Sequence, residues 1–168
     1  MKYVKALAGV FILVLIDRLT KSLAVTHLMG QEPIPIIKGV FELQYLENRG
    51  MAFGLFQEQR IFFVVTTILI LGALGFCYYL IPDTKKYIPL KIVGVFIYAG
   101  AIGNFIDRMV NGFVVDFFYF KLINFPIFNM ADIYVTGSGF VLFILVLFYY
   151  KGENDFNFLN FKKKNSEA

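Results

Sequence analysis

The sequence predicts an α-helical membrane protein with four transmembrane helices and a small extracytoplasmic β-sheet. Of its 168 residues, 58% are hydrophobic, and the mean hydropathy is +0.68, whereas about 45–50% of residues in soluble domains are apolar. The net charge is +4, but the basic residues gather at the chain ends and in one short loop and form no stripe for nucleic acid. We therefore expect membrane lipids, and no nucleic acid, among its partners.

Four segments are candidates for membrane-spanning helices, each of which needs ~20 mostly apolar residues. They cover residues 4–27, 61–81, 88–106 and 133–150. The second segment has no charge between Arg60 and Asp83, and Lys91 lies near the start of the third, from where its amine can snorkel. We expect one membrane domain over residues 1–151 and a polar cytoplasmic tail over residues 152–168.

The first segment has a second interpretation as a cleavable signal peptide, because N-terminal lysines precede a short apolar run. The cleavage site, Ser22-Leu23-Ala24, would be poor. Charged residues, among them Asp17 and Lys21, separate the apolar run from this site, which is unusual in signal peptides. On a continuing helix these two side chains lie one turn apart and neutralise each other. We therefore expect a retained helix.

The placement of the lysines predicts the direction of the spans. In a four-span arrangement one side of the membrane receives Lys2, Lys5, Lys85, Lys86, Lys91, Lys151 and the lysines at 162–164. Positive residues favour the cytoplasmic side. We therefore expect both termini in the cytoplasm and the connections over about 28–60 and 107–132 on the outside.

These two outer connections predict a small sheet. Residues 41–45 alternate apolar and polar side chains with the period of a half-buried strand. Pro33 and Pro35 precede them and suit an edge or entry position. In the second connection, the turn signal Asn111-Gly112 leads into β-prone residues 113–115. We expect the two segments to pair on the outer membrane surface.

Two acidic residues near the second connection are candidates for catalysis. Asp116 and Asp132 stand in aromatic-rich surroundings, where an ionised carboxylate loses hydration and needs a partner. Two carboxylates brought together do not readily both ionise, and a pair that shares a proton can activate water against an amide bond. Asp132 also has a capping explanation, because Asn129 precedes it at a helix start. We infer a membrane-embedded aspartyl peptidase.

Polar residues also close the third predicted helix. Asp107 and Arg108 are explained by an ion pair that anchors a helix end, but Asn104 adds an amide at membrane depth, where unsatisfied polar groups are costly. Gly100 and Gly103 supply a small-residue face for close helix packing. Both plain anchoring and a supporting role for the acids remain open.

Asn48 and Gly54 lie in a glycine-containing stretch before the second span. A tight re-entrant turn explains the glycines. Asn48 is also suited to bind a peptide substrate through its amide.

Other catalytic schemes fit the sequence poorly. Ser138 lies between two glycines, but His27, the only histidine, is at the far end of the first helix, so small-residue helix packing explains the serine better. One histidine and one cysteine leave no zinc site, and the acids lack helix-borne metal spacing. We expect no metal and no cofactor.

Five motifs, taken in order, resemble the bacterial lipoprotein signal peptidase family, or signal peptidase II. They are Asp17-x-x-Thr20-Lys21, Asn48-x-Gly50-x-Ala52-Phe53-Gly54, Gly103-Asn104-x-x-Asp107-Arg108, Val115-Asp116-Phe117 and Phe125-Pro126-x-Phe128-Asn129-x-Ala131-Asp132. They cover nearly the whole chain outside the tail. The family often has two glycines before the alanine of the third motif, whereas this chain has Tyr98-Ala99-Gly100-Ala101.

The resemblance implies a multi-pass protein of the bacterial cell (inner) membrane, with a sheet cradle and a metal-free aspartyl site near the outer face. The implied substrate is a prolipoprotein with a diacylglyceryl group on its lipobox cysteine, cut just before that cysteine. By motif, Asp116 and Asp132 match the catalytic pair. The surrounding polar and binding positions match Asp17, Lys21, Asn48, Gly54, Asn104, Asp107, Arg108 and Asn129.

Two other functional classes bury acids in membranes. A proton-coupled transporter should place them near mid-membrane, often in repeated halves, whereas here they cluster on one side. A non-enzymatic lipid-binding factor could have similar grooves, but this function does not explain the presence of Asp116.

Overall fold

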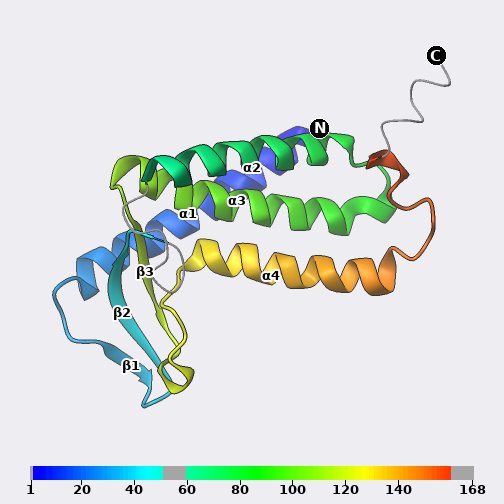
Figure 1. Ribbon diagram of the computed structural model, residues 1–168. Helices are drawn as coiled ribbons and strands as arrows, with labels where there is room; N and C mark the ends of the chain where they lie inside the picture. Colours follow the sequence, from blue (N-terminus) through cyan, green and yellow to red (C-terminus); the bar gives the residue numbers. More distant parts are fainter. Residues whose placement is uncertain (1, 51–59, 160–168) are drawn as a thin grey trace.

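The computed structural model describes residues 2–50 and 60–159. In this part, α1 (Lys2–Leu28), α2 (Arg60–Leu80), α3 (Ile88–Val110) and α4 (Met130–Ile144) form a helical bundle (Figure 1). The strands β1 (Ile34–Ile37), β2 (Phe41–Asn48) and β3 (Val114–Tyr119) form a sheet at one end of the bundle. Short 3₁₀ turns cover Lys85–Tyr87, Lys121–Ile123 and Asn157–Leu159, and a π-helical turn, Leu145–Tyr149, extends α4.

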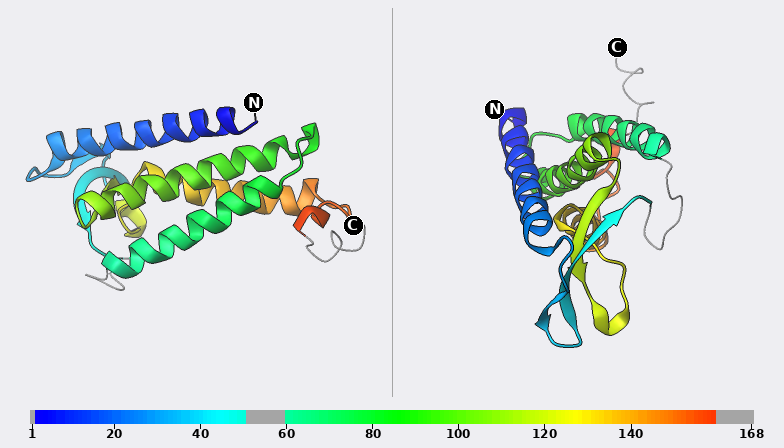
Figure 2. Two further views of the ribbon diagram at one scale, coloured as in Figure 1. Left: turned by 90° about the horizontal axis from the view of Figure 1, so that it is seen from above. Right: turned by 90° about the vertical axis from the view of Figure 1, so that its left-hand side faces the viewer.

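Helix α3 lies at the centre of the bundle and packs against each of the other three long helices. Figure 2 shows α1 and α2 on two sides of α3, with α4 beneath it and the sheet extending past α4. A polar side chain on the last turns of α3 therefore has neighbours from several elements.

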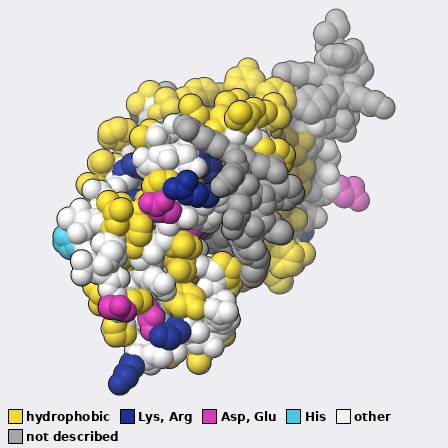
Figure 3. Space-filling model, turned by 60° about the vertical axis from the view of Figure 1, so that its left-hand side comes forward, with side chains coloured by type: hydrophobic (Ala, Val, Ile, Leu, Met, Phe, Trp, Pro, Cys, Tyr) yellow, Lys and Arg dark blue, Asp and Glu magenta, His cyan; other side chains and the backbone are white. Residues whose placement is uncertain are grey.

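Three helices of the described part are long and apolar enough to cross a membrane: α2, α3 with its preceding turn, and α4 with its π-helical turn. The 21 residues of α2 span about 31 Å at 1.5 Å per residue, close to the hydrocarbon thickness of a bilayer. Many apolar side chains of the long helices are exposed, among them Leu69, Ile92 and Phe140, and apolar side chains gather along the upper part of the face in Figure 3.

Helix α1 has 27 residues but is not one of these three. Asp17, Arg18 and Lys21 interrupt its apolar run. Its continuity through these charges agrees with the retained-helix interpretation. Four spans, and the cytoplasmic position of both ends, stay predictions.

Local sequence signals set the ends of the long helices. Pro82 follows α2 and disfavours helical geometry in the residue before it. Pro89 lies in the first turn of α3, where its missing N–H has no intrahelical partner to lose. Beyond α3, Gly112 takes a positive φ of 82°, which only glycine adopts without strain. The next chain segment is thereby turned back toward the bundle as β3.

Two glycines of α3 allow close approach of its neighbours. A Cβ on Gly100 would lie 2.5 Å from the carbonyl oxygen of Ala131, and one on Gly103 would lie 2.5 Å from Asp17 Oδ2. The predicted small-residue packing face is therefore confirmed. Ala99, beside Gly100, is fully buried.

The sheet is antiparallel with the order β1-β2-β3. The predicted strand at residues 41–45 is confirmed and continues to Asn48, and residues 114–115 of the second connection pair with it. Pro35 lies on the edge strand β1, where a missing ladder donor is tolerated. Val115 and Phe117 pack against α1. The sheet is thus joined to the bundle through β3.

Alternation along β2 predicts polar side chains on the solvent side, but Glu42 is buried. Its carboxylate accepts a 2.7 Å bond from Lys121 Nζ. Lys121 belongs to the connection between β3 and α4. The alternation within β2 does not predict where that connection lies, so it does not predict this partner for Glu42.

The opposite end of the bundle is closed by a small aromatic cluster in which Tyr87, Tyr150 and Phe156 take part. Residues 152–159, which the sequence prediction assigned to the polar tail, contribute to it because they carry aromatic side chains. The Tyr87 hydroxyl donates a 2.9 Å bond to the backbone oxygen of Asp155, and the Asp155 carboxylate pairs with Lys86.

Candidate active site

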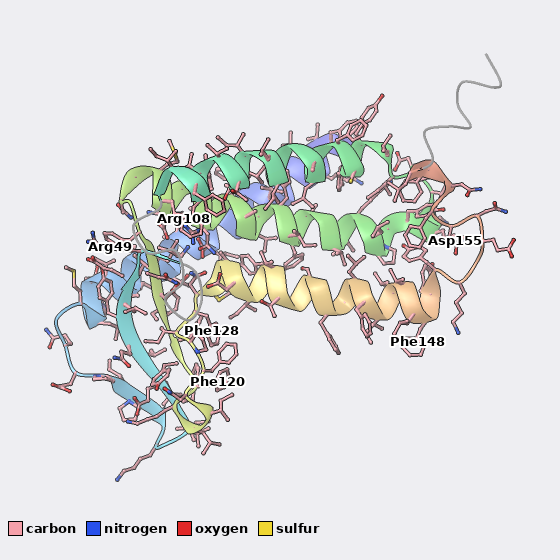
Figure 4. The ribbon with its side chains drawn as sticks, viewed as in Figure 1. Arg49, Arg108, Phe120, Phe128, Phe148 and Asp155 are labelled. Atoms are coloured by element: carbon pink, nitrogen blue, oxygen red, sulfur yellow. The ribbon has the colours of Figure 1, made fainter. Side chains whose placement is uncertain are left out.

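The polar side chains highlighted by the sequence meet at the sheet end of the bundle. They come from the second half of α1, the last turns of α3, β3 and the first turn of α4. Figure 4 shows Arg49 and Arg108 at this junction, whereas Asp155 lies at the opposite end.

Asp116 lies within β3, and its side chain is almost fully buried at 1% exposure. Oδ2 accepts a 2.8 Å hydrogen bond from Asn48 Nδ2, and Oδ1 accepts one of 2.6 Å from Asn129 Nδ2. Asp116 forms no ion pair with any residue of the described ranges. Its buried carboxylate is therefore held by neutral amides.

The surroundings of Asp116 favour its protonated form. Burial, followed by the nearby charge of Asp132, raises the pKa of Asp116 from the ordinary 3.8 to about 7. The hydrogen bonds from Asn48 and Asn129 act in the opposite direction. Near neutral pH both the protonated and the ionised forms of this carboxyl group are therefore populated.

Asp132 lies in the first turn of α4 and forms a capping box with Asn129. The backbone N–H of Asp132 donates to Asn129 Oδ1 at 3.1 Å, and the backbone N–H of Asn129 donates to Asp132 Oδ2 at 3.1 Å. The capping explanation is confirmed, but it occupies only one carboxylate oxygen. Oδ1 accepts a 2.8 Å bond from Asn104 Nδ2.

Asn129 thus contacts both candidate catalytic acids. Its side-chain amide donates to Asp116, while its backbone N–H donates to Asp132. The two carboxyl groups lie beside one asparagine, although they are 16 positions apart in sequence. Unlike Asp116, Asp132 is partly exposed, so water can reach at least one of the two acids.

Lys21 supplies the buried positive charge of the cluster. Its side chain is 2% exposed, and Nζ lies 2.9 Å from both Asp17 Oδ2 and Asp107 Oδ2. Nζ also donates a 2.9 Å bond to Asn104 Oδ1. The predicted pair of Asp17 and Lys21 is confirmed. Through Asn104 the lysine is connected to Asp132, so α1 supports the position of the acid on α4.

The ion pair between Asp107 and Arg108, one of the two interpretations considered for this helix end, is wrong. Consecutive residues of a helix project about 100° apart, so the two side chains meet different elements. Asp107 pairs with Arg18 and Lys21 of α1. The Arg108 guanidinium lies 4.9 Å from the centre of the Phe63 ring.

Arg108 also makes polar contacts at the site. It donates long bonds of 3.5 Å to the backbone oxygens of Asn104 and Gly50. Its charge lies close enough to interact with Asp132, Asp116 and Asp107. The guanidinium therefore spans from α3 to the chain segment that follows β2.

Asp17 has a role that the sequence did not predict. Its Oδ1 accepts a 3.0 Å bond from the backbone N–H of Ala131, one of the first N–H groups of α4. These groups have no partner within their own helix. Asp17 and Asn129 therefore both hold the helix start that carries Asp132.

Some residues of the site were missed or differ in role. Arg18 was not proposed, although it follows Asp17 within the first motif. Asn48 donates to Asp116, and its proposed contact with a peptide substrate stays a prediction. Gly54 lies outside the described residues.

Metal binding finds no support in the described ranges. No group of three or more His, Cys, Asp or Glu side chains is placed there to hold a metal ion. Metal-free catalysis stays a prediction.

Sequence comparison relates the whole bundle and sheet to known proteins. A family model described as signal peptidase (SPase) II matches residues 9–149. A lipoprotein signal peptidase of Streptococcus thermophilus is 41% identical over 154 residues, which cover 92% of this chain and 97% of that protein. A lipoprotein signal peptidase of Clostridioides difficile is 39% identical over 140 residues, covering 83% and 93%.

Solved structures show the same arrangement of elements. One bacterial membrane enzyme is 31% identical, with a TM-score of 0.77 over 89% of this chain and 92% of the other. A second has a TM-score of 0.74 at 31% identity, over 86% and 94%. The resemblance drawn from the five motifs is confirmed, and the chain belongs to the signal peptidase II family.

Proposed function

We propose that this protein is an intramembrane aspartyl endopeptidase that removes signal peptides from diacylglyceryl-modified prolipoproteins. It cuts just before the lipidated cysteine, with Asp116 and Asp132 activating water. The single observation that carries the mechanism is the contact of both carboxyl groups with Asn129. The relatives named lipoprotein signal peptidases support the substrate class.

The charge of the polar cluster favours one shared proton. The charged side chains gathered there are Asp17, Asp107, Asp116, Asp132, Arg18, Lys21 and Arg108. Four acids and three cations leave one negative charge in excess. A single proton neutralises the cluster, and neutrality is favoured because desolvated net charge is costly. Asp116 is the holder of this proton, since its pKa is raised to about 7.

In the first step, Asp132 acts as the general base. It takes a proton from water as the water oxygen attacks the scissile carbonyl carbon, while Asp116 gives its proton to the carbonyl oxygen. The result is a neutral tetrahedral diol. In the second step a hydroxyl proton returns to Asp116 and Asp132 protonates the leaving nitrogen. The C–N bond then breaks, and both acids regain their initial states.

The amides around the acids position them for this exchange. Asn104 and Asn129 hold Asp132, and Asn48 and Asn129 hold Asp116. Fixed hydrogen bonds reduce the reorganisation needed in the transition state. Each asparagine is therefore a positioning residue, because it acts through an acid.

The place of the acids suits a membrane-spanning substrate. They lie at the end of the bundle that bears the sheet, where a signal peptide that crosses the membrane beside the helices ends its span. The lysine distribution favours the outer face for this end. The acyl chains of the substrate lie between helices and add about 0.8 kcal/mol of affinity per buried CH₂.

Purified full-length protein tests the proposal with lipidated and unlipidated lipobox peptides. Cleavage should occur before the cysteine and be faster for the lipidated peptide. Asp116→Asn should reduce cleavage at least about 10³-fold, while the exposed acid variant Glu153→Gln should retain it.

Binding of the lipidated peptide without cleavage by the wild-type protein would favour a lipid-binding factor. Near-normal cleavage by Asp116→Asn would reject the assignment of the acids. Retained binding of the lipidated peptide by this variant separates loss of chemistry from loss of folding.

A further inference from the structure

A separate groove lies between α1 and α3, at the end of the bundle away from the acids. Its volume is about 700 Å³. Apolar side chains, among them Ile12, Leu13, Ile92 and Val95, form its walls. The groove reaches the N-terminal turns of both helices, and neither candidate catalytic acid lines it.

The mouth of the groove carries charge. Lys5, Lys91 and Asp83 line this end, and the amine of Lys91 pairs with the Asp83 carboxylate. Two lysines and one aspartate leave one positive charge in excess. Because Lys91 is paired with Asp83, the surplus charge belongs to Lys5, which is exposed. A ligand with one negative charge at its head therefore complements the mouth.

The groove is open to the apolar surroundings of the bundle. Ile12 and Ile92, one from each wall, are 55% and 53% exposed. Gly9 lies at the floor, where a Cβ would approach Val95 Cγ1 to 3.1 Å. From Lys5 to Leu13 the helix rises about 12 Å. A ligand that fits therefore has a charged head and a long apolar part that enters from the side.

We propose that this groove binds a membrane phospholipid whose headgroup carries a net negative charge. The phosphate lies between Lys5 and Lys91, and one acyl chain follows the groove past Gly9 toward Leu13. A zwitterionic headgroup is less suitable, because its amine adds a cation beside the surplus positive charge of the mouth. This site is independent of the peptidase mechanism.

Native mass spectrometry of the full-length protein in detergent tests this site with phosphatidylglycerol and phosphatidylcholine at equal concentration. The wild-type protein should retain phosphatidylglycerol preferentially. Each of Lys5→Gln and Lys91→Gln should reduce its retention about fivefold, the effect of one lysine beside an anionic lipid. Lys85→Gln removes the same charge at the same end, outside the groove, and should leave the preference unchanged.

A groove-filling variant tests the acyl-chain position. Ile12→Trp enlarges a half-exposed wall residue, so folding and cleavage of the lipidated peptide should persist while retention of phosphatidylglycerol falls. Phosphatidylglycerol should raise the melting temperature of the wild-type protein more than that of Lys5→Gln.

An equal loss of lipid in Lys85→Gln and Lys5→Gln would overturn the proposal, because it would show a diffuse surface attraction. Unchanged retention in Ile12→Trp would overturn it as well.

Discussion

The two ends of the helical bundle differ in the partners of their acidic side chains. At the end away from the sheet, Asp155 pairs with Lys86 and Asp83 pairs with Lys91. Each pair keeps one member in contact with solvent, since the side chains of Lys86 and Asp83 are 47% and 72% exposed. Asp155 and Asp83 are each paired with a lysine, so these contacts anchor the chain.

At the sheet end, only some of the acids form ion pairs with a cation. Asp17 and Asp107 are paired with Lys21, whereas Asp116 and Asp132 are held by asparagine amides. Amides orient a carboxylate without neutralising it, so burial and the nearby charge of Asp132 raise the pKa of Asp116. The two ends therefore differ in the partners of their carboxylates, which are asparagine amides at the sheet end and lysines at the opposite end. Amide partners suit proton transfer, whereas lysine partners suit anchoring.

The largest difference between the ends should appear on replacing one acid at each. Asp132→Asn should lower cleavage of a lipidated peptide by about 10³-fold or more, because the proposed general base is lost. Asp155→Asn should keep activity within about twofold, since an ion pair with an exposed lysine contributes little. Steady-state kinetics on both purified variants measures this contrast. Equal losses would mean that the acids at both ends act through folding.

Removal of a lysine at each end should sharpen the contrast in stability. Lys21→Met leaves Asp17 and Asp107 buried beside each other, so the free energy of unfolding should fall by about 3–5 kcal/mol. Lys91→Met breaks a pair with an exposed partner and should cost about 1 kcal/mol or less. Denaturant titrations in detergent micelles give both values. A small effect for Lys21→Met would show that water reaches the cluster.

Asparagines at the two ends should also differ. Asn129→Ala removes the amide from Asp116 and the cap of α4, so the turnover rate should fall about 10–100-fold through misplaced acids. Asn157→Ala, at the far end, removes a bond to Asn154 and should leave the turnover rate unchanged. If Asn129 served folding alone, the amount of folded protein would fall while the turnover rate of that fraction stayed normal.

The smallest effect should be a shift of the pH profile. Asp116 is proposed to hold a proton below its pKa of about 7, so activity should fall as the pH rises through this value. Asn48→Ala removes a hydrogen bond that lowers the pKa of Asp116, and the fall should then move to higher pH. Asn154→Ala should leave the profile in place. A shift of the Asn48 variant to lower pH would contradict the proposed proton holder.

Much of the fold was accessible from the sequence, because its signals are local. Hydropathy predicted the positions of α2, α3 and α4. The alternation of apolar and polar residues predicted β2, and the capping residues Asn129 and Asp132 indicated the start of α4. The partners of the charged residues were less accessible. Asp107 and Arg108 are adjacent in the chain but face different elements, and Arg18 contacts Asp107 across 89 positions.

By itself, the sequence determined the membrane character, the long apolar helices and the residue types of the site, since each depends on composition or on short-range pattern. Only the tertiary structure decided which cation meets which acid, how Asn129 serves two carboxyl groups, and that Asp17 supports the start of α4. These contacts join residues from different elements. They depend on how closely α1, α3 and α4 approach, and that distance is set by packing at Gly100 and Gly103.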